Sequence, residues 1–309
     1  MDIKIATSAG HPGRANEDYA GAVSDAVVLL DGAGIPGTES ICRHGTAWYT
    51  HRLGGVLLGK LSRHVGRDLT SILADAIEEL AASHRHTCDI SSPSSPQATV
   101  AITRVAAERL DYLVLADCFI VLGHASRKPL VLTDEREVAA RRTCSAPLAG
   151  LDLGSADYER VRDSCIEQLQ ARRNQPGGYW IAKEDPAAAA HALTGSEPLD
   201  GLSAVALMSN GASPAVTPYG LLNWAARLDV LSAQGPDEVI RRVRNAESLN
   251  PGDASAGAAD DATVAYLTAL RFGGVGRPAR VTAPDRSRNS ELASRVLRHI
   301  RNLIRSQLQ

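Results

Sequence analysis

The sequence lacks the features that define several common protein classes. Its five cysteines include no Cys-x-x-Cys pair, which argues against a structural zinc site or a disulfide framework and fits a reducing cytosol. They are Cys42, Cys88, Cys118, Cys144 and Cys165. No apolar run approaches the roughly 20 residues that span a bilayer, and the N-terminus has no basic segment followed by a long apolar one. We therefore expect a soluble, cytoplasmic protein without a transmembrane segment.

The chain also has little net charge. A formal charge of -2 over 309 residues gives no general attraction to nucleic acid, so we expect no nucleic-acid partner. A chain of this length can bury a large core, and length alone allows one large or two ordinary domains. We expect one continuous domain over residues 1–272, followed by a linker and a helix over residues 273–309. Function must then be sought in a local site.

One strand-like segment ends in a carboxylate. The apolar residues 27–30 are followed by Asp31-Gly32-Ala33-Gly34. This pattern predicts a strand buried on both faces, which would hold Asp31 at the rim of the core. A lone carboxylate leaving water costs several kcal/mol unless it is paired or bound to a metal. Asp31 alone could be a simple turn residue, but Glu17 and Asp18 lie in an upstream cluster with Arg14, and the extra acids favour cation binding.

Further polar residues follow other predicted strands. Residues 98–104, 110–115 and 119–122 predict antiparallel strands with Asp117 at a turn. Residues 203–208 predict a buried strand that ends near Asn210, and Asp260 precedes a last strand over residues 264–270. Oxygen ligands from separate strand ends suit Mg²⁺ or Mn²⁺, which prefer octahedral oxygen coordination. Zinc suits this set less, because it lacks histidines.

Helical periodicity separates these strands. It predicts helices over residues 44–61, 70–86, 155–175, 186–193, 221–233 and 236–249, and a short strand over residues 179–182. Residues 134–154 look irregular. His84, His86 and Cys88 are close enough for a soft metal site, but they fall at a helix end before a Ser/Pro loop, so we favour a surface role.

The order of the polar motifs resembles the metal-dependent protein phosphatases of type 2C, the PPM family, in its bacterial branch. The resemblance covers about residues 1–270 and depends on five segments. They are Asn16-Glu17-Asp18, Asp31-Gly32-Ala33-Gly34, Asp117-Cys118, Ser209-Asn210-Gly211 and Asp260-Asp261-Ala262-Thr263. It implies an α/β (α+β) fold, a four-layer α/β/β/α sandwich of two antiparallel sheets with metals between them at one end. Neighbouring pairs of predicted strands agree with that architecture.

The resemblance also implies residue roles. Asp31 would bridge two metal ions, with the Gly32 carbonyl as a second ligand, and Asp260 would be the second acidic ligand of the main site. Three more acids would serve the metals indirectly or at an accessory site: Glu17 and Asp18 would hold metal-bound waters, and Asp117 would bind an accessory ion. Arg14 would bind phosphate, since a guanidinium matches two oxygens at once. The cofactor would be two or three Mn²⁺ or Mg²⁺ ions.

One departure from the family pattern affects activity. Asn210 stands where the family has a metal-binding aspartate, so a charge is lost, which should weaken the metal and raise the pKa of its water. Ala116 and Cys118 also replace the residues that flank Asp117 in the family motif. We therefore keep two hypotheses. The first is a phosphatase that hydrolyses phosphoserine or phosphothreonine in proteins, or a small phosphate ester, with a metal-activated water. The alternative is a weak or inactive pseudophosphatase that acts as a binding or regulatory module.

Two segments outside the motifs remain. Residues 148–194 are expected to form loops that set substrate choice. Residues 290–308 predict an amphipathic helix with an apolar stripe opposite four arginines. We expect this helix to pack on the domain, which leaves the protein monomeric or weakly dimeric through it.

Overall fold

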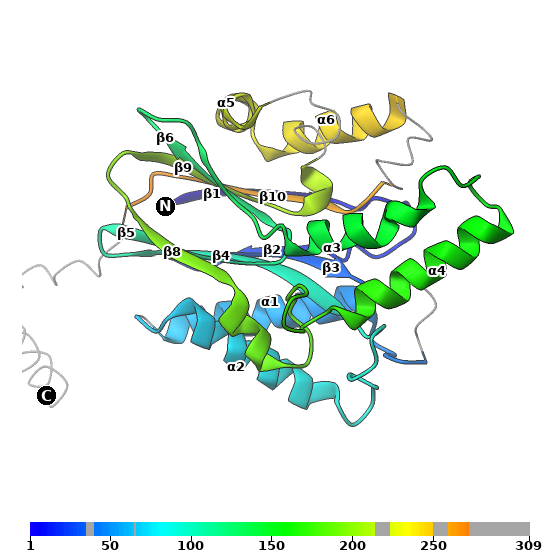
Figure 1. Cartoon of the computed structure of the whole chain (residues 1–309). Coiled ribbons are helices and arrows are strands. Elements are labelled where there is room, and N and C mark those ends of the chain that lie inside the picture. The colour runs from blue at the N-terminus through cyan, green and yellow to red at the C-terminus, as the bar shows by residue number, and fades with distance from the viewer. Residues whose placement is uncertain (35–39, 65, 214–222, 250–258, 272–309) are drawn as a thin grey trace, which may run out of the picture. The chain divides into compact units, whose positions relative to one another are not determined.

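Two antiparallel five-stranded sheets form the centre of the molecule (Figure 1). The computed structural model describes residues 1–271 except 35–39, 65, 214–222 and 250–258. The first sheet, called the β1 sheet, has the order β1 (Asp2–Ser8), β10 (Ala262–Thr268), β9 (Leu202–Met208), β6 (Phe119–His124) and β7 (Leu130–Leu132). The second, called the β3 sheet, has the order β2 (Tyr19–Ala22), β3 (Ala26–Ala33), β4 (Gln97–Ala106), β5 (Arg109–Leu115) and β8 (Leu193–Pro198).

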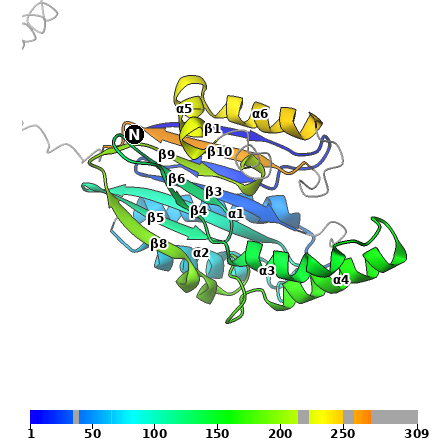
Figure 2. The same cartoon turned by 45° about the horizontal axis from the view of Figure 1, so that its top comes forward.

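Helices cover the outer face of each sheet, which makes four layers. The β3 sheet carries α1 (Gly45–Arg63) and α2 (Leu69–His84), and the β1 sheet carries α5 (Trp224–Gln234) and α6 (Pro236–Leu249) (Figures 1 and 2). A third core lies between the two sheets, where residues of β3 and β4 meet residues of β6, β9 and β10. The α/β/β/α sandwich expected from the sequence is therefore confirmed.

Alternation along β3 decides where Asp31 points. Val28 and Leu30 pack in the core under α1 and α2, whereas Val27 and Leu29 pack between the sheets. Successive side chains of a strand point to opposite faces, so Asp31 follows the second set toward the space between the sheets. The prediction of a strand buried on both faces is confirmed.

Three segments differ from the sequence predictions. Residues 134–154 are not irregular throughout, since α3 (Arg136–Ser145) lies there, before α4 (Ala156–Ala171). Residues 179–182 make isolated bridges to Ala98 and Arg173 instead of a strand. The helix over residues 186–193 is a short 3-10 turn, Pro186–His191, and an edge strand, β8, follows it. Leu193 is the one large aliphatic residue among the six of β8, and Pro198 at its end normally argues against a strand.

The predicted linker and helix over residues 273–309 lie outside the described residues. Within the described part of the chain, no helix is long and apolar enough to cross a membrane.

Candidate active site

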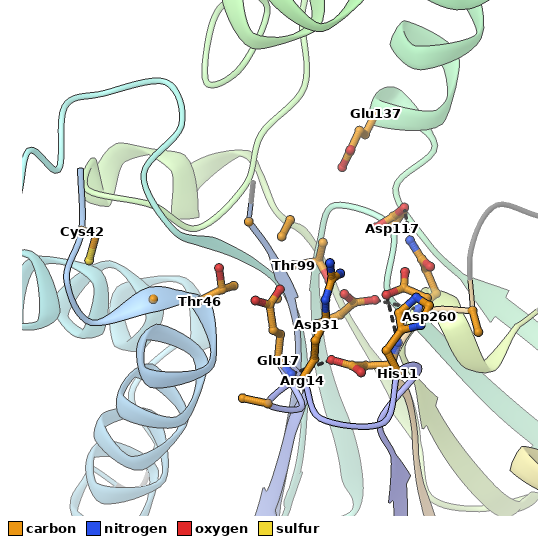
Figure 3. Close-up of a pocket in the computed structure, with 18 of the residues that line it drawn as sticks. His11, Arg14, Glu17, Asp31, Cys42, Thr46, Thr99, Asp117, Glu137 and Asp260 are labelled. Atoms are coloured by element: carbon orange, nitrogen blue, oxygen red, sulfur yellow. Dashed lines mark hydrogen bonds between the residues drawn. The ribbon is translucent and has the colours of Figure 1, made fainter. Parts of the chain in front are cut away.

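The acids singled out from the sequence meet at one end of the sandwich. They come from the loop between β1 and β2, the end of β3, the turn between β5 and β6, and the segments that follow β9 and precede β10. A cavity of about 580 Å³ is lined by all of the residues assigned to the site except Asp18: Arg14, Glu17, Asp31, Gly32, Asp117, Asn210 and Asp260 (Figure 3). Asp18 is buried, with 4% of its surface exposed.

Asp31 occupies the centre of this group. Its Oδ2 accepts a 2.9 Å hydrogen bond from the backbone N–H of Asn210, which ties β3 to the start of the 3-10 turn Asn210–Ala212. Burial raises the pKa of Asp31 well above its ordinary value, and the charges of Asp18, Asp260 and Asp117 raise it further. Without a cation, the folded chain therefore resists ionising this carboxyl group.

Asp18 lies in a similar environment. Both of its carboxylate oxygens are buried and make no hydrogen bond of regular geometry to any residue that the structure describes. Burial raises the pKa of Asp18 to about 7, an effect that the hydroxyl groups of Thr263 and Ser209 oppose and the acids Asp261 and Asp260 reinforce. A buried carboxylate with unused oxygens is costly as it stands, and a bound cation would remove that cost.

The rim of the pocket carries two more acids with raised pKa values. Burial raises the pKa of Glu17, Asp261 adds to the effect, and the Thr46 hydroxyl group opposes it. Asp260 keeps part of its side chain exposed, yet surrounding protein atoms still raise its pKa, while the backbone N–H of Asp261 and the charge of Arg244 act against the shift.

Asp261, next to Asp260, accepts hydrogen bonds from two backbone N–H groups of the Arg14 loop. Its Oδ1 accepts a 2.8 Å hydrogen bond from the N–H of Gly10, and its Oδ2 accepts a 2.6 Å bond from the N–H of Glu17. These two bonds fix both ends of the loop that carries Arg14. The same carboxylate therefore holds the Glu17 side of the pocket against the start of β10.

Close backbone approach explains two of the glycines. A Cβ on Gly32 would lie 2.6 Å from the carbonyl oxygen of Glu17, and one on Gly211 would lie 2.0 Å from the carbonyl oxygen of Asp261. Real Cβ atoms do not approach backbone so closely, so any side chain there would separate the strand ends. The glycines of the Asp31-Gly32 and Asn210-Gly211 pairs therefore allow these chain segments to approach each other closely.

Asn210 and Asp117 contact each other directly. The Asn210 Nδ2 donates to Asp117 Oδ2 at 3.1 Å, while the other oxygen, Asp117 Oδ1, is buried and has no hydrogen-bond partner within the described ranges. Ala116 precedes this aspartate with a φ of 64°, a left-handed conformation that favours glycine. An amide at position 210 removes one negative charge from the group and stabilises the remaining acids by donating a hydrogen bond.

Further residues that line the pocket were not predicted from the sequence, above all Glu137 and Arg141 on α3. Their side chains form a 2.7 Å ion pair, and burial, together with Asp117, raises the pKa of Glu137. In Figure 3, Glu137 lies beyond Asp117, on the opposite side of the pocket from Glu17. The sequence pattern predicts no helix over residues 134–154 and gives no basis for placing Glu137 in the site. His11, Thr46 and Thr99 also line the pocket.

The donor set fits a hard divalent cation. The groups facing the pocket are carboxylates, an amide and backbone carbonyls, which are the ligands that Mg²⁺ and Mn²⁺ prefer. Asp18 and Asp117 have buried oxygens that accept no hydrogen bond from the described part of the chain, so their lone pairs can serve a cation or its waters.

Comparisons place this architecture among known structures. No protein-family model matches the sequence, and no curated protein matches it. Solved structures do match. The serine/threonine phosphatase PstP/Ppp of Mycobacterium tuberculosis is 15% identical with a TM-score of 0.50, and the match covers 86% of this chain and 97% of that one.

Three further structures match with slightly higher scores. A bacterial serine phosphatase is 13% identical with a TM-score of 0.54, covering 87% of this chain and 97% of that one. The serine/threonine phosphatase Stp1 of Staphylococcus aureus is 13% identical with a TM-score of 0.53, covering 86% and 94%. PstP has also been solved in complex with two manganese ions, with a TM-score of 0.51 to this chain at 15% identity, covering 86% and 96%. The resemblance noted in the sequence is confirmed at the level of structure: the chain has the fold of the bacterial PPM-type serine/threonine phosphatases.

Proposed function

We propose that the protein is a metal-dependent phosphatase that hydrolyses phosphoserine or phosphothreonine in proteins, or a small phosphate ester. The observation that carries this proposal is the convergence of Asp18, Asp31, Asp117 and Asp260 in one site. Asp18 and Asp117 have buried oxygens without a hydrogen-bond partner among the described residues, and the pKa values of Asp18, Asp31 and Asp260 are raised. Burying these four acids close together without a ligand is unfavourable, and a bound cation would offset that cost. The shared fold with serine/threonine phosphatases supports the choice of reaction.

The metal would be Mn²⁺ or Mg²⁺, with two or three ions. Asp31 and Asp260 would hold the main centre, with the Gly32 carbonyl and Asn210 beside them, and Asp117 would hold an accessory ion. When bound, such ions supply a nucleophilic water at neutral pH and offset phosphoryl charge. Glu17 and Asp18 would accept hydrogen bonds from metal-bound waters and so fix their orientation. Hydrolysis of this kind needs no covalent intermediate with the protein.

Arg14 would orient the phosphate. It is exposed at the mouth of the pocket, on the loop that Asp261 fixes, and its charge lowers the pKa of Glu17. A guanidinium can donate to two phosphate oxygens, which positions the phosphorus for in-line attack and neutralises charge on the equatorial oxygens. Residues 148–194, which include α4, would contribute to substrate choice because they follow α3, whose Glu137 and Arg141 line the pocket.

A second candidate function is a pseudophosphatase that binds a phosphorylated partner. The hydrogen bond from Asn210 to Asp117 favours it, because the amide donates to an acid at a position where the family supplies a charged ligand. Fewer charges around the cation lower its affinity and make its water less acidic.

A manganese titration with an aryl phosphate assay tests both functions. We expect hydrolysis that rises with Mn²⁺, stops on chelation and is lost in Asp260→Asn. Asp229→Asn is the matched control, because this residue is exposed on α5, away from the pocket. Manganese binding by calorimetry without hydrolysis would favour the pseudophosphatase. Absence of both binding and hydrolysis would contradict both functions.

A further inference from the structure

A second group of potential metal ligands lies outside the acidic site. Cys42 and His44 immediately precede α1, His84 is the last residue of α2, and Cys88 follows it by four positions. One ligand atom from each of the four lies within 4.8 Å of the other three. We propose that these four residues bind one zinc ion, at a site distinct from the proposed Mn²⁺ or Mg²⁺ centre.

The distances suit a tetrahedral ion after a small contraction. His44 Nδ1 lies 3.3 Å from Cys88 Sγ and 3.9 Å from Cys42 Sγ. With Zn–S near 2.3 Å and Zn–N near 2.0 Å, tetrahedral geometry places ligand atoms roughly 3.3–3.8 Å apart. Two thiolates and two imidazoles also form one of the common structural zinc sets. Soft sulfur ligands disfavour Mg²⁺ and Mn²⁺, so the two sites should select different metals.

Burial and local packing pre-organise the cluster. Cys42 and His84 are 3% and 4% exposed, and the Nδ1 of His84 is buried without a hydrogen-bond partner in the described part of the chain. The Trp48 ring stacks on His44, with their centroids 4.2 Å apart. Burying an imidazole nitrogen without a hydrogen-bond partner is unfavourable, and coordination to a metal ion would offset that cost.

Backbone hydrogen bonds hold the two contributing segments together. The N–H of Asp89 donates to the carbonyl of Ile41 at 2.9 Å, and the N–H of Cys88 donates to the carbonyl of His84 at 3.0 Å. The second bond continues the helical turn, so positions 84 and 88 lie on one face.

These observations change two sequence interpretations. The surface role expected for His84 is wrong, because its side chain is buried. The lack of a Cys-x-x-Cys pair does not prevent two cysteines from meeting here, because the ligands are arranged as Cys-x-His and His-x-x-x-Cys, brought together by the packing of α1 against α2.

The cluster borders the active-site pocket. Cys42 lines that pocket, as do Gly45 and Thr46 in the first turn of α1, and Figure 3 shows Cys42 at its edge, beyond Thr46. The Thr46 hydroxyl group is also one of the groups that lower the pKa of Glu17. A zinc ion would therefore fix the start of α1 beside the acids and have a structural role.

Metal analysis of the full chain, purified from zinc-supplemented cells, tests the proposal. We expect about one zinc per chain, falling below about a tenth of that value in Cys42→Ser and in Cys88→Ser, since a structural site needs all four ligands. His86→Ala and Cys144→Ser are the controls and should keep the zinc, because neither residue belongs to the cluster. Removing the zinc should lower the melting temperature by on the order of 10 °C.

Cobalt substitution distinguishes this cluster from the acids. Co²⁺ in the cluster should give visible absorption of a tetrahedral ion and a thiolate-to-cobalt charge-transfer band, whereas oxygen ligands give no such band. The band should persist in Asp31→Asn and disappear in Cys42→Ser. This titration uses wild-type protein as its main sample, so it stays informative if a cysteine variant fails to fold. A disulfide between Cys42 and Cys88 in protein kept under reducing conditions, or failure of the wild-type chain to bind zinc and to give the band, would overturn the proposal.

Discussion

Replacing Asn210 with aspartate should change stability in opposite directions with and without metal. In the wild-type chain, the Asn210 amide donates to Asp117 at 3.1 Å, and its backbone N–H donates to Asp31. Asn210→Asp removes the side-chain donor and adds a carboxylate beside two acids. Without metal the folded state should lose stability, and with Mn²⁺ the added charge should stabilise the complex.

The magnitude follows from the geometry. Two full charges at the observed 3.1 Å repel by about 5 kcal/mol at an effective dielectric constant of about 20. The realised cost is capped at about 4 kcal/mol, because protonating an ordinary aspartate at pH 7 costs about that much. For a domain of this size, a cost of about 2–4 kcal/mol corresponds to a fall of about 5–15 °C in melting temperature.

The metal-bound state should show the reverse. An added carboxylate ligand raises affinity for a divalent cation, and we expect manganese to bind at least about tenfold more tightly, with higher turnover. Thermal unfolding with a chelator and with saturating Mn²⁺, together with calorimetry, measures both effects. Asn245→Asp is the matched control, because it makes the same substitution at an exposed position of α6. If the metal-free melting temperature and the manganese affinity both stay the same, or if the affinity falls, Asn210 does not belong to the metal site.

Three other predictions concern the acids and the tail. Asp31→Asn or Asp260→Asn should abolish manganese-dependent hydrolysis while the protein stays folded, and unchanged turnover would refute their assignment. Burial raises the pKa of Asp18 from 3.8 to about 7, so the folded state binds the proton more tightly than the unfolded state does. Without metal, the free energy of unfolding should therefore fall by up to about 4 kcal/mol as the pH rises from about 4 to about 7. Urea unfolding measures this change, and a rise in the free energy of unfolding over this range would contradict the shift. A chain that ends at Phe272 should melt at a lower temperature or bind an apolar dye if the tail helix packs on the domain, whereas an unchanged melting point with lost binding to anionic vesicles would indicate an anionic target instead.

The sequence predicted most central strands because they are strongly apolar, whereas their arrangement in four layers came from the family resemblance. β3 and β9 carry apolar runs over residues 26–30 and 204–208, and β4 pairs in register with β3 on one side and with β5 on the other. Weakly patterned elements were missed. β8 has the sequence Leu-Thr-Gly-Ser-Glu-Pro and pairs only at an edge, so tertiary contacts with β5 define it, not propensity.

The acids of the candidate site could be identified because each ends or precedes a predicted strand. The structure brings most of them to one pocket, and their roles stay predictions. Glu137 and Thr46 reach this pocket through the packing of α3 and α1, which no local sequence pattern encodes. The sequence indicates His84 and Cys88 as possible metal ligands but not Cys42 and His44, because these two lie at least 40 positions earlier and meet the others only when α1 packs on α2.

Anomalous scattering from a crystal soaked in manganese would show directly whether the acids of the candidate site bind the metal. We expect manganese density between Asp31 and Asp260, with further density near Asp117. Manganese absent from these acids at a concentration that saturates related metal sites, or bound only elsewhere on the chain, would contradict it.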